Sequence, residues 1–231
     1  MSTLIKKIFE PKCLVLTWRS PNPDGGYFSI AKIQRLENGN IEFSYLVDNE
    51  EYKKALSLGF KEYSAFRKEK IKYTDHVLEM FTRRLPSRKR ADFKDYLKQI
   101  GIDPSVEISD FALLAYSSAK LATDNFKIIN TLDDLTMPCE IIMEVAGVRY
   151  YVKDKTSINI GDSVSFKEEP TNIYDKNAIQ IIHADKVIGY VSKVQCKQFK
   201  YTLKKNNVEA TVLKMNGTEL RPTLYLKVNI Y

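Results

Sequence analysis

The stretch Leu224-Tyr225-Leu226-Lys227-Val228-Asn229-Ile230 decides the fold, because its apolar side chains occupy every second position. A period of two is typical of a β-strand with one buried face. The same alternation occurs in shorter runs upstream, which contain Ile141, Met143 and Val145, then Val164 and Phe166, then Ile179 and Ile181. One helix fits between these runs, at about residues 193–205. Five or six short strands and one helix within about 95 residues predict a small OB-like β-barrel.

Strands are also predicted near the beginning of the chain. Residues 14–18 form a short apolar run that is typical of a buried strand. Residues 27–33 and 41–45 flank Asn38-Gly39, and an Asn-Gly pair between two such segments is a strong hairpin signal.

Four helices are predicted after the hairpin. Asp48 is expected to cap the first, and Glu51 has the position of its capping-box partner. Apolar residues at helical spacing predict the second at about residues 77–85. Ser87 is expected to cap the third, and Asp103, which precedes a proline, is expected to cap the fourth.

These patterns predict an α+β protein. Residues 1–60 are expected to form a small β-sheet and helix subdomain, and residues 61–130 a helical region. Residues 131–138, a polar run that ends in proline, are expected to be a linker. Residues 139–231 then form the OB-like barrel with its one helix, so the barrel is preceded by a β-hairpin and helical N-terminal region.

The composition is that of a globular protein. Of the 231 residues, 44% are hydrophobic, 28% are charged and 11% are aromatic, which is enough to bury a core. The longest uncharged apolar stretch near the start, residues 13–18, is far shorter than the roughly 18–20 residues of a membrane span. It also lacks the cleavage site of a signal peptide. We therefore expect a cytoplasmic protein without a membrane partner.

Residues for metal or catalytic chemistry are scarce. The three cysteines, Cys13, Cys139 and Cys196, form no CxxC pair, so we expect free thiols and no zinc site. Glu168 and Glu169 are neighbours on a predicted strand, and side chains on opposite faces cannot both hold one metal ion. The sequence contains no Gly-rich phosphate loop, nucleophile elbow, HExxH or kinase motif. We therefore expect no cofactor and no enzymatic activity.

The net charge is +7, and such an excess of Lys and Arg suits a polyanionic partner. The excess is concentrated in residues 61–98 and 137–231. A possible basic patch in the first segment consists of Arg83, Arg84, Arg88, Lys89 and Arg90. A helix that begins after Ser87 would add free backbone N–H groups, which bind phosphate. A solvated basic turn explains the same residues equally well.

A series of motifs in residues 139–231 resembles the HIRAN domain. The motifs are Val148-Arg149-Tyr150-Tyr151, Gly161-Asp162-x-Val164, Glu169-Pro170-x-Asn172-x-Tyr174-Asp175-x-Asn177-Ala178-Ile179 and Ile188-Gly189-Tyr190-Val191. HIRAN domains occur in Rad5-type helicases and in the helicase-like transcription factor, and alone in bacteria. More loosely, the N-terminal part resembles the segment that precedes bacterial HIRAN domains. Its hairpin, residues 30–45, is similar to the small N-terminal subdomain of HipA-like kinases.

The resemblance implies a modified OB-type barrel that captures the 3′ end of single-stranded DNA. Arg149 and Tyr150 match the pair that meets the terminal nucleotides, the arginine by charge and the aromatic ring by stacking. Tyr174 and Asp175 match the loop pair that closes around the terminal sugar, where the aspartate accepts a hydrogen bond from the free 3′-hydroxyl.

Three further positions follow from the resemblance. Lys193 matches a phosphate-binding lysine, and Tyr190 has the place of a DNA-contacting histidine in the animal helicase. The aromatic residue that the family carries near the last strand has no clear counterpart in this sequence, where Leu220 is the nearest residue. The chemistry of the residues agrees, since aromatic faces hold the bases of a single strand and cations hold its phosphates. Asp175 would repel an internal phosphate but can accept a hydrogen bond from a terminal hydroxyl.

Each of these residues also has a simpler interpretation. Residues 170–177 could be a turn in which Asn and Asp bind the local backbone. Tyr150 and Tyr151 could be strand residues, one facing inward and one outward. Lys193 could belong to a solvated helix face.

Two functions remain open from the sequence. The first is a sensor of free DNA 3′ ends in repair or in anti-phage defence. The second is a regulatory subunit of a HipA-like kinase toxin system, whose N-terminal part docks on the kinase or another effector protein.

Overall fold

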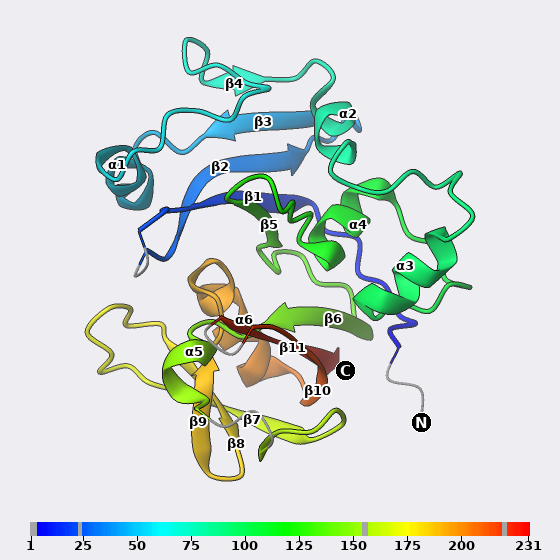
Figure 1. Cartoon of the computed structure of the whole chain (residues 1–231), viewed down its shortest axis with the longest axis vertical. Helices are drawn as coiled ribbons and strands as arrows, with labels where there is room; N and C mark the ends of the chain where they lie inside the picture. Colours follow the sequence, from blue (N-terminus) through cyan, green and yellow to red (C-terminus); the bar gives the residue numbers. More distant parts are fainter. Residues whose placement is uncertain (1–3, 23–24, 154–156, 219–220) are drawn as a thin grey trace. The chain divides into compact units, whose positions relative to one another are not determined.

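The computed structural model describes residues 4–22, 25–153, 157–218 and 221–231 (Figure 1). They form two compact units that are interleaved along the chain. The N-terminal unit consists of Glu10–Phe93 and Ile108–Asp134. The C-terminal unit consists of Lys94–Glu107 and Leu135–Tyr231, together with the described residues up to Phe9. One boundary between the units therefore falls inside the predicted linker, residues 131–138.

An antiparallel five-stranded sheet lies at the centre of the N-terminal unit, with the strand order β4-β3-β2-β1-β5. The strands are β1 (Cys13–Arg19), β2 (Tyr27–Arg35), β3 (Ile41–Tyr45), β4 (Lys72–Tyr73) and β5 (Phe126–Asn130). The predicted hairpin is confirmed, because β2 pairs with β3 and places Ala31 opposite Tyr45. The segment predicted to be helical, residues 61–130, also contains β4 and β5, and β5 pairs with β1.

The helices begin at residues other than those predicted. They are α1 (Glu50–Ser57), α2 (Val77–Thr82), α3 (Phe93–Ile100) and α4 (Asp110–Ser117). Asn49 caps α1 in place of Asp48, because its side chain accepts a hydrogen bond from the Glu51 N–H at 2.7 Å. The Glu51 carboxylate does not complete a capping box but accepts from the Ser29 N–H at 2.8 Å.

The other two predicted caps form turns instead. The Ser87 hydroxyl accepts from the Lys89 N–H at 3.3 Å, and α3 begins only at Phe93. Asp103 binds the Ser105 N–H at 3.0 Å, so that its side chain closes a local turn. The helix expected there starts at Asp110, where Ser109 is the cap. None of the helices in the described part of the chain is both long and apolar enough to cross a bilayer.

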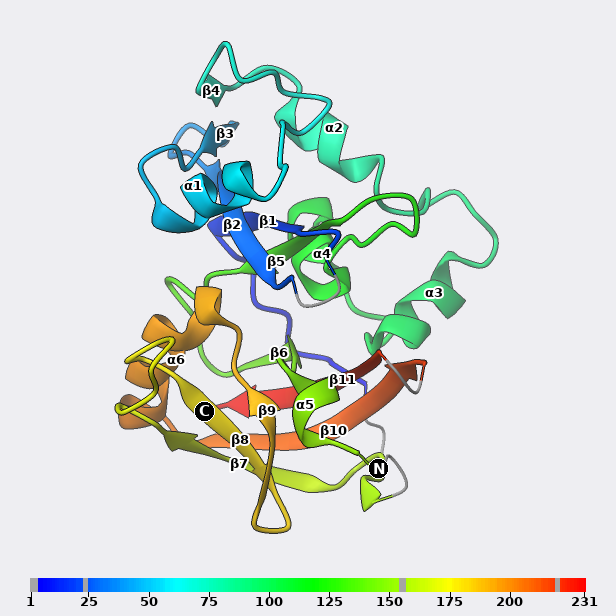
Figure 2. The same cartoon turned by 60° about the vertical axis from the view of Figure 1, so that its left-hand side comes forward.

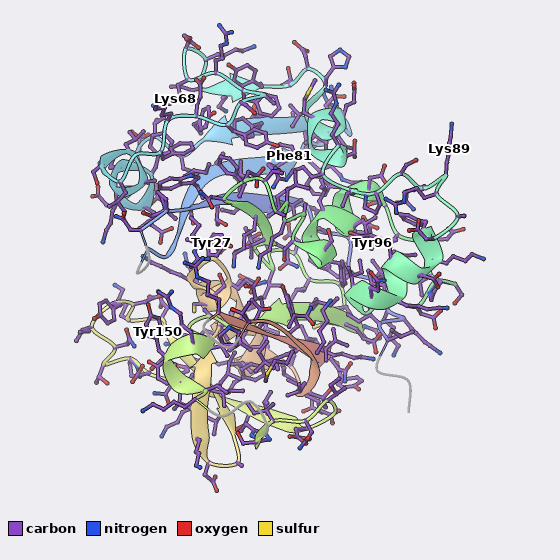
Figure 3. The ribbon with its side chains drawn as sticks, viewed as in Figure 1. Tyr27, Lys68, Phe81, Lys89, Tyr96 and Tyr150 are labelled. Carbon is purple, nitrogen blue, oxygen red and sulfur yellow. The ribbon has the colours of Figure 1, made fainter. Side chains whose placement is uncertain are left out.

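Aromatic side chains fill the core of the N-terminal unit. The ring of Phe43 on β3 stacks on Phe66 with the centroids 4.4 Å apart, and Tyr45 meets it edge-on at 4.8 Å. Phe81 of α2 is fully buried against the same cluster (Figure 3). The Tyr45 hydroxyl accepts from the Tyr63 N–H at 2.9 Å, which satisfies its polar end.

A six-stranded sheet forms the C-terminal unit, with the order β6-β11-β10-β7-β8-β9. The strands are β6 (Cys139–Glu144), β7 (Ser163–Glu168), β8 (Ile179–His183), β9 (Lys186–Tyr190), β10 (Val208–Gly217) and β11 (Pro222–Ile230). Two helices accompany them, α5 (Val148–Tyr151) and α6 (Lys193–Lys205). The alternation along β11 and the helix predicted at residues 193–205 are both confirmed, since every second residue of β11 is buried.

The two edge strands of this sheet meet and curl it into an OB-like barrel (Figure 2). Ala146, just beyond β6, exchanges two backbone hydrogen bonds with Tyr190 of β9, at 2.7 and 2.9 Å. Gly189 permits this approach, because a Cβ there would lie 2.5 Å from both the Ala146 carbonyl oxygen and Val145 Cγ1. The α+β class with a C-terminal OB-like barrel is therefore confirmed.

Residues from outside positions 139–231 complete the C-terminal unit. The Glu140 N–H donates to the Lys7 carbonyl at 2.8 Å, and the Glu140 carboxylate accepts from Lys227 Nζ at 2.8 Å. Lys214 Nζ donates a hydrogen bond of 2.8 Å to the carbonyl oxygen of Gln99, which is the last residue but one of α3. The edge strand β6 is thus covered by the chain that precedes β1.

Candidate nucleic-acid interface

The loop between β7 and β8 presents two large side chains to solvent. Ile173 is 88% exposed and Tyr174 is 86% exposed. Asn172 Oδ1 accepts hydrogen bonds from the N–H groups of Tyr174 and Asp175, at 2.9 and 3.1 Å. Asp175 Oδ1 accepts in turn from the Asn177 N–H at 2.9 Å. The interpretation of these residues as a local turn is therefore correct for the backbone, while the Tyr174 ring remains outside the core.

A second layer of side chains supports this loop. Glu169 Oε2 accepts from Asn172 Nδ2 at 2.7 Å and from the Tyr190 hydroxyl at 2.9 Å. These two hydrogen bonds hold the pKa of Glu169 below its usual value. Burial, together with hydrogen bonding to Tyr151, raises the pKa of Tyr190 to about 12. Tyr190 is therefore a neutral donor that ties β9 to the loop.

The prediction that Tyr150 and Tyr151 alternate on a strand is wrong. Gly147 has a φ of +78° and begins a helical turn, α5, on which both rings are exposed, at 59% and 44%. The Arg149 guanidinium lies 4.5 Å from the centroid of the Tyr150 ring, and it also donates to the Tyr150 hydroxyl. The Tyr151 ring lies 5.5 Å from that of Tyr190. Tyr190 thus contacts both α5 and the support of the loop.

Asp175 and Lys193 lie near the first turn of α6. Burial and the Asp175 carboxylate raise the pKa of the Cys196 thiol, the Lys193 ammonium lowers it, and the resulting pKa is about 11. Both charges therefore act on the same buried sulfur. Lys193 itself is exposed at the start of the helix.

The matches to known proteins agree with this geometry. The family model described as the HIRAN domain matches residues 139–231. These residues form a HIRAN domain. No curated protein matches the chain.

Three solved structures are similar to the HIRAN domain of this chain. The crystal structure of the HIRAN domain of human HLTF is 24% identical over 39% of this chain and 74% of that chain, with a TM-score of 0.33. The NMR structure of the HLTF HIRAN domain in its DNA-bound conformation is 23% identical over 39% and 73%, with a TM-score of 0.32. A protein from Lactobacillus plantarum is 21% identical over 38% and 91%, with a TM-score of 0.31.

The predicted DNA-contacting residues of the HIRAN domain fall into two groups around Tyr190. Arg149 and Tyr150 lie on α5, whereas Tyr174 and Asp175 lie on the β7–β8 loop. Lys193 follows Tyr190 by three residues and is exposed at the start of α6. Leu220 lies outside the described residues. The roles of these residues in binding remain predictions.

The predicted basic patch is not a cluster of available charges. Arg84 is buried and forms a bidentate ion pair with Asp124, with N···O distances of 2.6 and 3.0 Å. Its Nε also donates a hydrogen bond to the Ala119 carbonyl at 2.9 Å. It therefore joins parts of the N-terminal unit. The other arginines also meet carboxylates, Arg83 with Glu79 at 3.0 Å, Arg88 with Asp110 at 2.6 Å and Arg90 with Asp92 at 2.6 Å. Lys89 is exposed (Figure 3). Because no helix begins after Ser87, the expected backbone N–H groups are not presented there.

The three cysteines are free and buried, as expected for structural thiols. Glu168 binds Lys200 of α6 at 2.7 Å, whereas Glu169 binds the loop, so the two neighbouring carboxylates serve different partners. In the described residues no group of three His, Cys, Asp or Glu side chains is placed to hold a metal ion.

Sequence reasoning missed the supporting role of Glu169. It was visible only as part of a motif, and nothing in the sequence indicates that its carboxylate reaches Tyr190, which lies 21 residues away.

Proposed function

We propose that the HIRAN domain is a binding module that captures the free 3′ end of single-stranded DNA, without catalysing a reaction on it. The family match supports binding to DNA. The observation that carries the proposal is the Tyr174–Asp175 pair on a hydrogen-bonded loop, where the Tyr174 side chain is 86% exposed. A sensor of this kind fits the repair of DNA ends or defence against foreign DNA.

Two exposed tyrosines provide the stacking faces in this proposal. Tyr150 and Tyr174 each expose more than half of their surface, and stacking of a base on an aromatic ring contributes about 1–3 kcal/mol. Arg149 beside the Tyr150 ring and Lys193, which is exposed at the start of α6, supply positive charge for the phosphates. Aromatic faces and cations together suit a strand that is held without regard to its base sequence.

Asp175 gives the site its preference for a strand end. A carboxylate repels the phosphate that follows every internal nucleotide, but it accepts a hydrogen bond from a terminal 3′-hydroxyl. Oδ1 already accepts from the Asn177 N–H, which fixes the direction of the carboxylate. Because each carboxylate oxygen has two lone pairs, the group retains the capacity to accept the hydroxyl.

A competition between two oligonucleotides tests this proposal. Fluorescence anisotropy should show that an oligonucleotide with a 3′-hydroxyl binds more tightly than its 3′-phosphate twin, and both should be recovered intact. Asp175→Asn keeps an acceptor for the Asn177 N–H and removes the charge. It should lower the preference for the hydroxyl by roughly ten- to a hundredfold, the value of a hydrogen bond to a charged group. Glu209→Gln, at an exposed position of β10, is the matched control and should change nothing.

Equal binding of the two oligonucleotides by the native protein would refute end capture and leave general strand binding. Binding that does not weaken with salt, together with a protein that co-purifies, would favour the regulatory subunit of a HipA-like kinase or another effector instead. DNA binding releases counterions and must depend steeply on salt.

A further inference from the structure

The lysines of α6 are divided between two sides of the helix. The helix contains five lysines and no acidic residue. Glu168 on β7 pairs with two of them, Lys200 at 2.7 Å and Lys204 at 3.9 Å. In the described part of the chain, no carboxylate forms an ion pair with Lys197 or Lys205. The positive charge of these two lysines is therefore available to a polyanion.

An exposed tyrosine lies in line with the lysines that Glu168 does not hold. Four exposed side chains, each four residues from the next, form what we call the α6 stripe: Lys193, Lys197, Tyr201 and Lys205. Side chains at this spacing are neighbours along one face of a helix. The Tyr201 ring is 51% exposed, although the Lys205 ammonium lies 4.3 Å from its centroid. Phe199, on the other face, is fully buried, so the stripe is the side of α6 that the fold leaves in solvent.

The composition of the α6 stripe suits a single strand of nucleic acid. Lysines bind phosphates, and an aromatic ring between them stacks on an unpaired base, which the interior of a duplex does not offer. The stripe begins at Lys193, three residues after Tyr190, whose hydroxyl donates to Glu169 in the support of the β7–β8 loop. From residue 193 to residue 205 the helix rises about 18 Å, which corresponds to about five nucleotides of a stacked strand.

We propose that the α6 stripe is a track for the part of a single strand that lies 5′ of the captured end. The inference rests on the proposed capture of 3′ ends. The strand leaves the site of Tyr174, its phosphates bind the lysines of the stripe one after another, and Tyr201 stacks on one of its bases. Because phosphate contacts and stacking do not read base edges, the track adds affinity for longer 3′ tails without adding sequence preference.

Two single-stranded oligonucleotides with a free 3′-hydroxyl test the track on the full chain by fluorescence anisotropy. The native protein should bind one of about ten nucleotides at least tenfold more tightly than one of about three, because only the longer strand reaches along the helix. Lys197→Gln combined with Lys205→Gln should lower the slope of log K against log salt for the longer strand by about 1.4, at about 0.7 per phosphate contact. The slope for the shorter strand should stay unchanged.

Two further variants separate the track from a general attraction by charge. Lys94→Gln combined with Lys186→Gln removes the same charge from exposed positions of the same unit outside α6, and should leave both slopes unchanged. Tyr201→Ala should weaken binding of the longer strand by about fivefold or more, the value of one stacked base. Tyr201→Phe keeps the ring and should retain the affinity for the longer strand.

Three results would overturn the track and leave end capture in place. The first is equal binding of the two lengths by the native protein. The second is a slope that falls as much for the control at positions 94 and 186 as for the stripe variant. The third is native binding of the longer strand by Tyr201→Ala, which would exclude a base on the ring. Equal affinity of the native protein for the 3′-hydroxyl and 3′-phosphate forms of the shorter strand would instead refute the proposed function, and the track with it.

Discussion

Residues 83–90 and the site of the HIRAN domain are both basic in the sequence, yet the structure uses their charges differently. In the first region each arginine meets a carboxylate, and Arg84 is buried with Asp124, which lies 40 residues away in the chain. In the second, the Arg149 guanidinium lies over the exposed Tyr150 ring, and Lys193 is exposed at the start of α6. A run of basic residues therefore indicates an available surface only when its acidic partners are known.

The acidic and amide side chains of the two regions also serve different purposes. Asp124 neutralises the cation that it contacts, whereas Asn172 and Glu169 use their hydrogen bonds to fix a loop and leave its side chains in solvent. Ion pairs that join distant segments stabilise a fold. Hydrogen bonds that hold the backbone of an exposed loop prepare it for a ligand, because less conformational entropy is lost on binding.

The largest effect is expected for Arg84→Ala. The substitution leaves the Asp124 carboxylate and the Ala119 carbonyl without their buried partner. Breaking a buried ion pair on one side costs about 3–5 kcal/mol, and we expect the free energy of unfolding of the N-terminal unit to fall by that amount. Urea denaturation measures it.

Arg83→Ala is the matched control for this loss. Arg83 pairs with Glu79 on the surface, at side-chain exposures of 65% and 57%, so its removal should cost no more than about 0.5 kcal/mol. If the two variants lose a similar free energy of unfolding, Arg84 is not a buried core residue as described, and its assignment to the core is contradicted.

A smaller effect is expected for Gly189→Ala, which tests the closure of the barrel. The added Cβ would lie 2.5 Å from the Ala146 carbonyl, and the φ of +150° adds strain, so we expect a destabilisation of about 2–3 kcal/mol. Gly161→Ala in the same unit, where φ is +92° and no atom lies within 4 Å, should cost about 1 kcal/mol. Thermal unfolding that ranks the two variants in the opposite order would refute the role of Gly189 at the joint.

The sequence predicted the elements whose pattern is regular over many residues. The helix α6 was found with its limits, and the alternation of β11 was found from Leu224 onward, two residues after the strand begins, because burial on one face imposes a period that the residues display. Helix starts were predicted less well, since Asp48, Ser87 and Asp103 are good caps that the chain uses differently. Such residues favour turns as much as helix caps.

The site was predictable only in part, because its motifs identify residues but not their partners. Tyr174 and Asp175 could be named from the motif. The link from Asn172 through Glu169 to Tyr190 could not, since it joins positions brought together by the pairing of β7, β8 and β9. The helical turn at Val148–Tyr151 was missed because the same residues have the composition of a strand.

The salt dependence of DNA binding tests most directly whether the HIRAN domain, and not residues 83–90, holds the strand. For a single-stranded oligonucleotide, the slope of log K against log salt should fall by about 1–2 when Arg149 and Lys193 are both replaced by Ala, because each phosphate contact contributes about 0.7. Replacement of Arg88, Lys89 and Arg90 by Ala should leave the slope unchanged. A slope that falls for the second variant and stays constant for the first would contradict this account.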